Sequence, residues 1–197
     1  MQPLRRAKHV AVVTTGVIIV ALMASFQSAI AQSGSSAVHI NARACGAAVK
    51  ADVSVRSADA DAREVAKGPS GQPISVPAGT YDIEITCTDL VDHPNQTLTG
   101  VKIGGGETLE REASFECGVT TLHVKLGGKV LKGTQMVLTP SGGEECPGKV
   151  LSGEPFKASP GEYRAEIRLG KGRTSAVHSI DGIQVYDGAT RNIPVSL

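Results

Sequence analysis

Residues 79–87 read GTYDIEITC, and residues 161–169, which begin 82 positions later, read GEYRAEIRL. From the tyrosine onward, apolar and polar side chains alternate in both segments, so that Tyr81, Ile83 and Ile85 share one face of the first. A period of two is the signature of a half-buried β-strand. The two segments therefore predict two equivalent strands, each with an apolar face toward a core and a charged face toward solvent.

The repetition extends well beyond this strand. With the same offset of 82 and no gap, residues 71–115 align with residues 153–197. The identical positions of the first copy are Gly71, Pro73, Gly79, Tyr81, Glu84, Ile85, Gly100, Gly106, Thr108 and Ser114. Farther upstream, an offset of 84 places His39 opposite His123 and implies a small insertion or deletion in between. An internal repeat of this length indicates two copies of one structural unit.

Most of the remaining sequence also suggests strands. Short alternating runs recur between turns rich in glycine and proline, such as those at residues 68–71, 104–106 and 141–143. Strands and turns at this spacing are typical of β-sandwiches and barrels, with about seven strands in each copy. We therefore expect an all-β protein with two tandem β-sandwich domains of prealbumin-like or immunoglobulin-like type, at residues 37–115 and 116–197.

The turn before the tyrosine strand carries a family resemblance. The sequences PAGTYDIEI at residues 77–85 and SPGEY at residues 159–163 resemble the P-x-G-x-Y-x-[IV]-x-[IV] signature of carboxypeptidase-regulatory-like domains. The resemblance implies a prealbumin-like (transthyretin-like) sandwich of the kind found as tandem repeats in bacterial envelope proteins. The signature marks the fold and contains no reactive group. Its residues here are Gly79, Tyr81, Gly161 and Tyr163, with the glycines expected to relieve backbone strain in a tight turn and the tyrosines to pack as structural corners.

The N-terminus predicts export. A basic stretch at residues 5–8 precedes an apolar run at residues 10–23 and then Ala29-Ile30-Ala31. This order is that of a secretory signal peptide, here residues 1–31, followed by a flexible linker at residues 32–36. An uncleaved membrane anchor is the alternative, but the apolar run is shorter than the roughly 20 residues that a membrane span needs. We expect a periplasmic or secreted protein with no membrane span after cleavage.

The cysteines fit an oxidising compartment. The chain has four, all in the predicted mature part: Cys45, Cys87, Cys117 and Cys146. An even number in an exported chain predicts two disulfides, and the lack of a C-x-x-C pair disfavours zinc. Of three possible pairings we favour Cys45–Cys87 and Cys117–Cys146, one within each copy. The second pair follows if residues 122–126 and residues 134–138 form a hairpin that brings its cysteines together.

The residues that could carry chemistry do not form a motif. His39 and His123 flank apolar residues that face inward, so both are expected to face solvent on separate domains, where they make a poor metal site. No G-x-S-x-G nucleophile motif occurs. A net charge of +1 and an aromatic content of 3% disfavour nucleic-acid partners. The sequence therefore predicts no catalytic, cofactor-binding or metal-binding residue.

These patterns lead to a hypothesis about function. They favour a non-enzymatic exported module with a structural, adhesive or protein-binding role in the cell envelope, whose partner is a protein or another envelope component. One alternative is a carrier of small molecules or peptides that uses a cleft between the copies or a sheet edge. The other is an enzyme whose site the sequence does not disclose.

The signal-peptide hypothesis makes a direct prediction. Mass spectrometry of the exported protein should find Gln32 at its N-terminus, because signal peptidase cleaves after the small residue Ala31. Recovery of only the full-length chain from membranes would show instead that residues 1–31 remain as an anchor.

Overall fold

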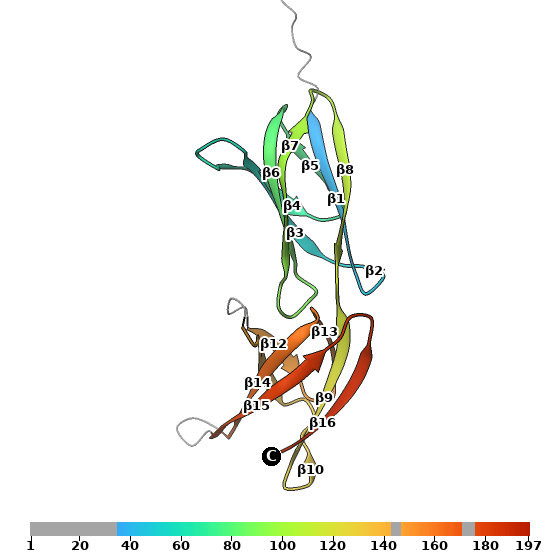
Figure 1. The fold of residues 1–197 in the computed structure, drawn as a ribbon, viewed down its shortest axis with the longest axis vertical. Coiled ribbons are helices and arrows are strands. Elements are labelled where there is room, and N and C mark those ends of the chain that lie inside the picture. Colours follow the sequence, from blue (N-terminus) through green and yellow to red (C-terminus); the bar gives the residue numbers. More distant parts are fainter. Residues whose placement is uncertain (1–34, 143–146, 171–175) are drawn as a thin grey trace, which may run out of the picture. The chain divides into compact units, whose positions relative to one another are not determined.

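The computed structural model of this 197-residue chain describes residues 35–142, 147–170 and 176–197 (Figure 1). The predicted signal peptide, residues 32–34 of the predicted linker, and Cys146 lie outside the described residues. The regular structure in the described part is all β, which confirms the predicted fold class. None of the described residues belongs to a helix long and apolar enough to cross a membrane.

The strands fall into two successive sets of eight in the described part of the chain. The first set is β1 (Ser36–Ala44), β2 (Ala47–Ala48), β3 (Ala51–Ser57), β4 (Glu64–Pro69), β5 (Pro73–Val76), β6 (Gly79–Cys87), β7 (Asn95–Ile103) and β8 (Thr108–Phe115). The second set is β9 (Gly118–Leu126), β10 (Lys129–Val130), β11 (Gln135–Pro140), β12 (Gly148–Leu151), β13 (Pro155–Ala158), β14 (Gly161–Leu169), β15 (Ala176–Val185) and β16 (Thr190–Ser196).

The two sets have the same topology. In the first, one sheet has the order β4-β3-β6-β7, and in the other β1 pairs with β2 and β5 antiparallel and with β8 parallel. In the second, β12-β11-β14-β15 form one sheet, and β9 pairs with β10 and β13 antiparallel and with β16 parallel. The predicted repeat is thus reproduced strand for strand. The sequence estimate was about seven strands in each copy, and each set in the described part has eight, one of them the two-residue strand β2 or β10.

The pairing register corrects the alignment of the first strands. Pro73 of β5 lies opposite His39, whereas the equivalent Pro155 of β13 lies opposite Thr121. His39 is therefore equivalent to Thr121 and not to His123, and the offset of 82 holds in this strand too. The offset of 84 was wrong because it matched residue types in a short alternating run, where a shift of two positions preserves the inward and outward faces.

The change of offset occurs farther along the chain. Glu84 and Glu166, which are equivalent, lie opposite Ser54 and Val137, so the offset in β3 and β11 is 83. The hairpin before β3 and the hairpin before β11 begin at equivalent positions. The second copy therefore has one extra residue between β10 and β11, where a loop accommodates it without disturbing either ladder.

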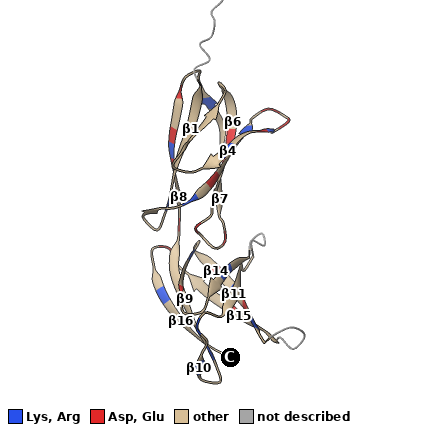
Figure 2. Ribbon diagram, turned by 180° about the vertical axis from the view of Figure 1, so that it is seen from behind, with Lys and Arg blue, Asp and Glu red and all other residues tan. Residues whose placement is uncertain are grey.

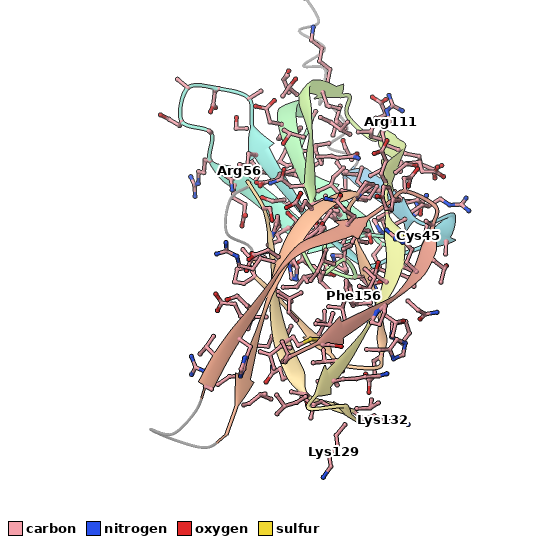
Figure 3. The ribbon with its side chains drawn as sticks, turned by 60° about the horizontal axis from the view of Figure 1, so that its bottom comes forward. Cys45, Arg56, Arg111, Lys129, Lys132 and Phe156 are labelled. Atoms are coloured by element: carbon pink, nitrogen blue, oxygen red, sulfur yellow. A yellow bond between two sulfur atoms is a disulfide. The ribbon has the colours of Figure 1, made fainter. Side chains whose placement is uncertain are left out.

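Each set of strands encloses its own apolar core. In the first, Ile83, Ile85 and Cys87 are fully buried, and in the second Leu122 and Ile167 are fully buried, as the alternation predicts. Burial of one such aliphatic side chain contributes about 1.5–3 kcal/mol. Charged residues of both signs are scattered along the ribbon (Figure 2). Figure 3 shows Arg111, Lys129 and Lys132 pointing away from the strands.

The two signature tyrosines make the same contact in both copies. The Tyr81 ring is buried and its hydroxyl donates to the Pro77 carbonyl at 2.8 Å, and the Tyr163 hydroxyl donates to the Ser159 carbonyl at 2.8 Å. Both bonds reach back four residues, across the turn that precedes the strand. The tyrosines thus fix the turn to the core, which is the structural role that the sequence predicts.

The glycine of the first signature is needed for a different reason from the one expected. Gly79 does not have a positive φ; instead, a Cβ there would lie 2.8 Å from the Tyr81 hydroxyl oxygen. Gly79 therefore makes room for the tyrosine ring. At Gly161 the nearest atom of the Tyr163 ring would lie at 3.8 Å, an ordinary contact distance, so the two corners are packed differently.

The tyrosine corners allow a stability test. Tyr81→Phe and Tyr163→Phe should each lower the free energy of unfolding by about 0.5–1.5 kcal/mol, because each removes one partly buried hydrogen bond between the tyrosine and the preceding turn. Urea titrations followed by circular dichroism would measure the loss. Tyr186→Phe is the control, since this side chain is 53% exposed. An equal loss for all three variants would contradict the assigned role of the corners.

Candidate functional site

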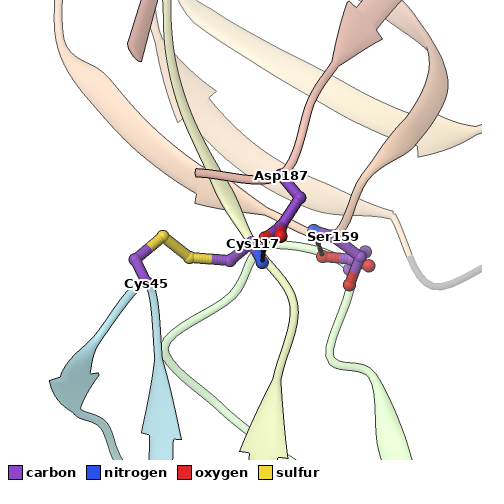
Figure 4. The surroundings of a disulfide bond; sticks show 5 residues. Cys45, Cys117, Ser159 and Asp187 are labelled. Atoms are coloured by element: carbon purple, nitrogen blue, oxygen red, sulfur yellow. Dashed lines mark hydrogen bonds between the residues drawn. A yellow bond between two sulfur atoms is a disulfide. The ribbon is translucent and has the colours of Figure 1, made fainter. Parts of the chain in front are cut away.

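A disulfide joins the two copies at the end of the first (Figure 4). It links Cys45 to Cys117, whose Cα atoms are 5.3 Å apart. Both predicted pairings, Cys45–Cys87 and Cys117–Cys146, are therefore wrong. The Cys87 thiol is buried and forms no disulfide with any described residue, and its burial raises its pKa.

The predicted Cys117–Cys146 pairing depended on a hairpin that does not form. Residues 122–126 belong to β9 and residues 134–138 lie largely in β11, but these strands pair in different sheets. The parallel pairing of β1 with β8 decides the true arrangement, because its register places Ala44 opposite Phe115. Each strand ends there, and a cysteine follows each end within two residues.

The backbone on both sides of the disulfide is well defined. Cys45 and Gly46 form the two-residue turn between β1 and β2, with φ values of 49° and 73°. Cys117 is fully buried. Its amide donates to a carboxylate oxygen of Asp187 at 3.1 Å, and its carbonyl accepts from the Gly188 amide at 3.0 Å. The loop between β15 and β16 therefore holds Cys117 in place (Figure 4).

A second set of contacts comes from the loop between β6 and β7, residues 88–94. The Val91 amide donates to the Lys157 carbonyl at 2.9 Å, and a carboxylate oxygen of Asp92 accepts from the Ser159 amide at 3.0 Å. Lys157 lies in β13, which pairs with β9 through its other edge. The loop thus covers the free edge of β13, a position where an unpaired strand invites association.

The loop between β6 and β7 also lies close to Gly148 and Tyr163. A Cβ added to Gly148 would overlap the carbonyl of Val91, so the loop and the start of β12 are in close backbone contact. Burial, followed by the nearby Asp92 carboxylate, raises the pKa of the Tyr163 hydroxyl well above its usual range. The second tyrosine corner is therefore neutral at physiological pH and lies beside a carboxylate of the first copy.

The described surface includes two hollows that open to solvent. One of about 440 Å³ lies over the sheet of β11, β12, β14 and β15 and is lined by Gln135, Val137, Lys149, Glu166, Arg168, Gly170 and Val177. Another of about 560 Å³ lies beside β1 and is lined by Asn41, Ala42, Arg43, Ala48, Val49, Ser70, Gly71 and Glu112. Charged groups of both signs line each of them, beside apolar side chains such as Val137 in the first and Val49 in the second.

The histidines do not form a site with each other. His39 lies 3.7 Å from the Glu110 carboxylate, and His123 lies 3.4 Å from the side-chain oxygen of Asn192. Within residues 35–142, 147–170 and 176–197, no three His, Cys, Asp or Glu side chains are grouped so that they could hold a metal ion.

Asp92 and Asp187 carry no sequence signal that would identify them as contact residues. Their hydrogen-bond partners are 67 and 70 residues away in the sequence. Single acidic residues in polar loops are common, and nothing in their neighbourhood distinguishes these two. Only the folded arrangement of the two copies brings them to their partners.

The chain has only distant likenesses to known proteins. No family model matches it, and no curated protein matches its sequence. Among solved structures it is similar to the Bacillus anthracis TIE protein (14% identity, TM-score 0.32), covering 82% of this chain and 33% of that one. It is also similar to a candidate adhesin of Bacteroides ovatus (12% identity, TM-score 0.40), covering 83% of this chain and 92% of that one. A third likeness is to the tip fimbrial protein Mfa3 of Porphyromonas gingivalis (11% identity, TM-score 0.34), covering 74% and 80%.

These TM-scores are too low to establish a shared fold. The chain spans about a third of the length of the TIE protein. The resemblance to carboxypeptidase-regulatory-like domains, which no family model matches, stays a prediction.

The disulfide can be checked by chemistry. Digestion of the exported protein without reductant should yield a peptide pair that contains Cys45 and Cys117, because their Cα separation suits a disulfide. Mass spectrometry before and after reduction identifies it. Reduction should also lower the free energy of unfolding by about 2–4 kcal/mol. A peptide pair that joins Cys45 to Cys87 would contradict the structure and support the pairing that we predicted for Cys45 from the sequence.

Proposed function

We propose that this chain is a non-enzymatic, exported structural module that transmits tension within the cell envelope, in the periplasm or after secretion. Its two domains, residues 37–115 and 116–197, act as scaffold and contact a protein or another envelope component through their outer faces. The observation that carries the proposal is the parallel pairing of the first and last strand in each copy, β1 with β8 and β9 with β16.

Parallel terminal strands determine how a domain responds to pulling. When two strands are parallel, the start of one and the end of the other lie at opposite ends of the pair. Tension applied to the two ends of the copy then slides the strands along each other, so that the ladder hydrogen bonds resist together rather than one after another. The ladder of β1 and β8 has eight register positions and that of β9 and β16 has seven (Figure 1).

The interior supports a scaffold rather than a carrier. Both cores are filled mainly by aliphatic side chains, and the two hollows described above lie on the outside of the sheets and have charges of both signs in their linings. A carrier of small apolar molecules requires an apolar cavity. The repeated Gly-x-Tyr turns support a place among carboxypeptidase-regulatory-like repeats, whose signature is structural, and we include that assignment in the proposal.

The role of the last ladder can be tested with proline. The Ala189 carbonyl and the Leu197 amide both form hydrogen bonds with β9. In a parallel ladder, every second residue of a strand directs its backbone amide and carbonyl toward the same neighbouring strand. Arg191 therefore points its amide toward β9. The Asn192 amide points away from β9, as does the backbone nitrogen of the natural Pro194. Arg191→Pro removes a ladder bond, whereas Asn192→Pro does not.

Single-molecule pulling from the two chain ends should separate these variants. We expect Arg191→Pro to unfold the second copy at a clearly lower force than the wild type, and Asn192→Pro to remain close to it. Arg191→Ala controls for the lost stacking of the guanidinium on Tyr186, whose ring centroid lies 4.9 Å away. Equal unfolding forces for Arg191→Pro and Asn192→Pro would refute a load-bearing ladder.

A further inference from the structure

The disulfide joins the end of β1 to the residue through which tension leaves the first copy. Cys45 directly follows Ala44, the last residue of β1, and Cys117 directly precedes Gly118, the first residue of β9. A load applied at Ser36 therefore passes along β1 to Cys45 and then has two routes to Cys117. One is the covalent sulfur bridge, and the other is the remainder of the first copy.

We propose that the Cys45–Cys117 disulfide is a covalent load bypass that keeps the first copy folded under tension and leaves the second copy as the extensible part. This inference rests on the load-bearing function proposed above. The bridge is the shorter route by far, because the two cysteines are 72 residues apart in the sequence and their Cα atoms are 5.3 Å apart. The residues between them, β8 included, carry no load while the bridge is intact, so the β1–β8 ladder resists tension only when the bridge is broken.

The strand outside the closed loop adds little length. Residues 36–44 form β1, which is already extended. A strand rises 3.2–3.4 Å per residue, close to the limit of about 3.3–3.6 Å for a fully stretched chain. Detachment of β1 would therefore lengthen the molecule only slightly, and the oxidised first copy behaves as an almost inextensible segment.

Comparison with the second copy indicates that the β1–β2 turn does not itself require a cysteine at residue 45. The β1–β2 turn at Cys45-Gly46 and the β9–β10 turn at Gly127-Gly128 are equivalent, since each lies between the last paired residues of its hairpin. The φ values at the first turn position are 49° for Cys45 and 55° for Gly127. Glycine adopts this left-handed conformation without strain, whereas a cysteine does so at a cost. What Cys45 adds to the turn is its sulfur.

The hydrogen bonds around Cys117 transfer the load to the second copy. The Asp187 carboxylate and the Gly188 amide bond to the backbone of Cys117, and both lie just before β16. The bridge therefore ends at a residue already attached to both strands of the β9–β16 ladder. Tension that arrives through the sulfur atoms is applied directly to that ladder.

Single-molecule pulling tests the bypass when the mature chain is attached at its two ends. The quantity measured is the total extension of the chain after unfolding. Breaking the bridge should release the residues between the cysteines, about 250 Å of extra contour at 3.3–3.6 Å per residue. We expect the oxidised wild type to show the shorter total extension. The wild type in reductant, and Cys45→Gly in reductant, should both be longer by this amount.

Two variants keep the result interpretable. Cys45→Gly installs the residue of the equivalent turn, so the turn keeps its conformation and the protein keeps its fold. Cys87→Ala also removes a cysteine but leaves the bridge, and without reductant it should keep the short extension. Equal extension with and without reductant would overturn the proposal, as would a long extension for oxidised Cys87→Ala.

The outcome separates this inference from the proposed function. The bypass is measured as a length, whereas the load-bearing function is measured as a force and by its sensitivity to Arg191→Pro. If the oxidised protein shows the short extension but unfolds at a low force that Arg191→Pro does not change, the proposed function is refuted and the bypass is retained. An unchanged extension at high force refutes the bypass and retains the function.

Discussion

The parallel pairing of the first and last strand of each copy is the constraint on which the rest of the molecule depends. It places the end of β1 beside the end of β8, and thereby brings Cys45 to the cysteine that opens the second copy. In a purely antiparallel meander the two strand ends would lie at opposite ends of the pair, and this disulfide could not form. The same pairing recurs between β9 and β16, so the two copies share one arrangement of their first and last strands.

The two copies share their backbone frame and differ in what is added to it. The Gly71 amide bonds to the Ile40 carbonyl and the Gly153 amide to the Leu122 carbonyl, both at 2.8 Å, so the frame is reproduced down to single hydrogen bonds. At the first hairpin, one copy has a cysteine where the other has a glycine. One half of the duplicated scaffold thus has a cysteine of the covalent link at this turn, and the other half has the less strained glycine.

The described contacts between the copies include hydrogen bonds of backbone and carboxylate groups, and the Val91 side chain of the first copy also packs against the second core. Asp92 and Asp187 each accept a hydrogen bond from an amide of the other copy or of the connecting residues. Gly148 permits the approach of the Val91 carbonyl, because any side chain there would overlap it. Hydrogen bonds to charged groups are stronger than those between neutral groups, so a few such contacts suffice to hold a loop in place.

The sequence by itself determined the all-β class, the duplication and the inward face of each tyrosine strand, because these follow from a period of two and from local turn chemistry. It also indicated the structural role of Tyr81 and Tyr163. Only the tertiary structure decided the disulfide, the equivalence of His39 with Thr121 and the roles of Asp92 and Asp187. Each of these depends on which strands become neighbours and in which register. Alternation specifies the face of a strand but not its partner, since a shift of two residues leaves every side chain on the same side.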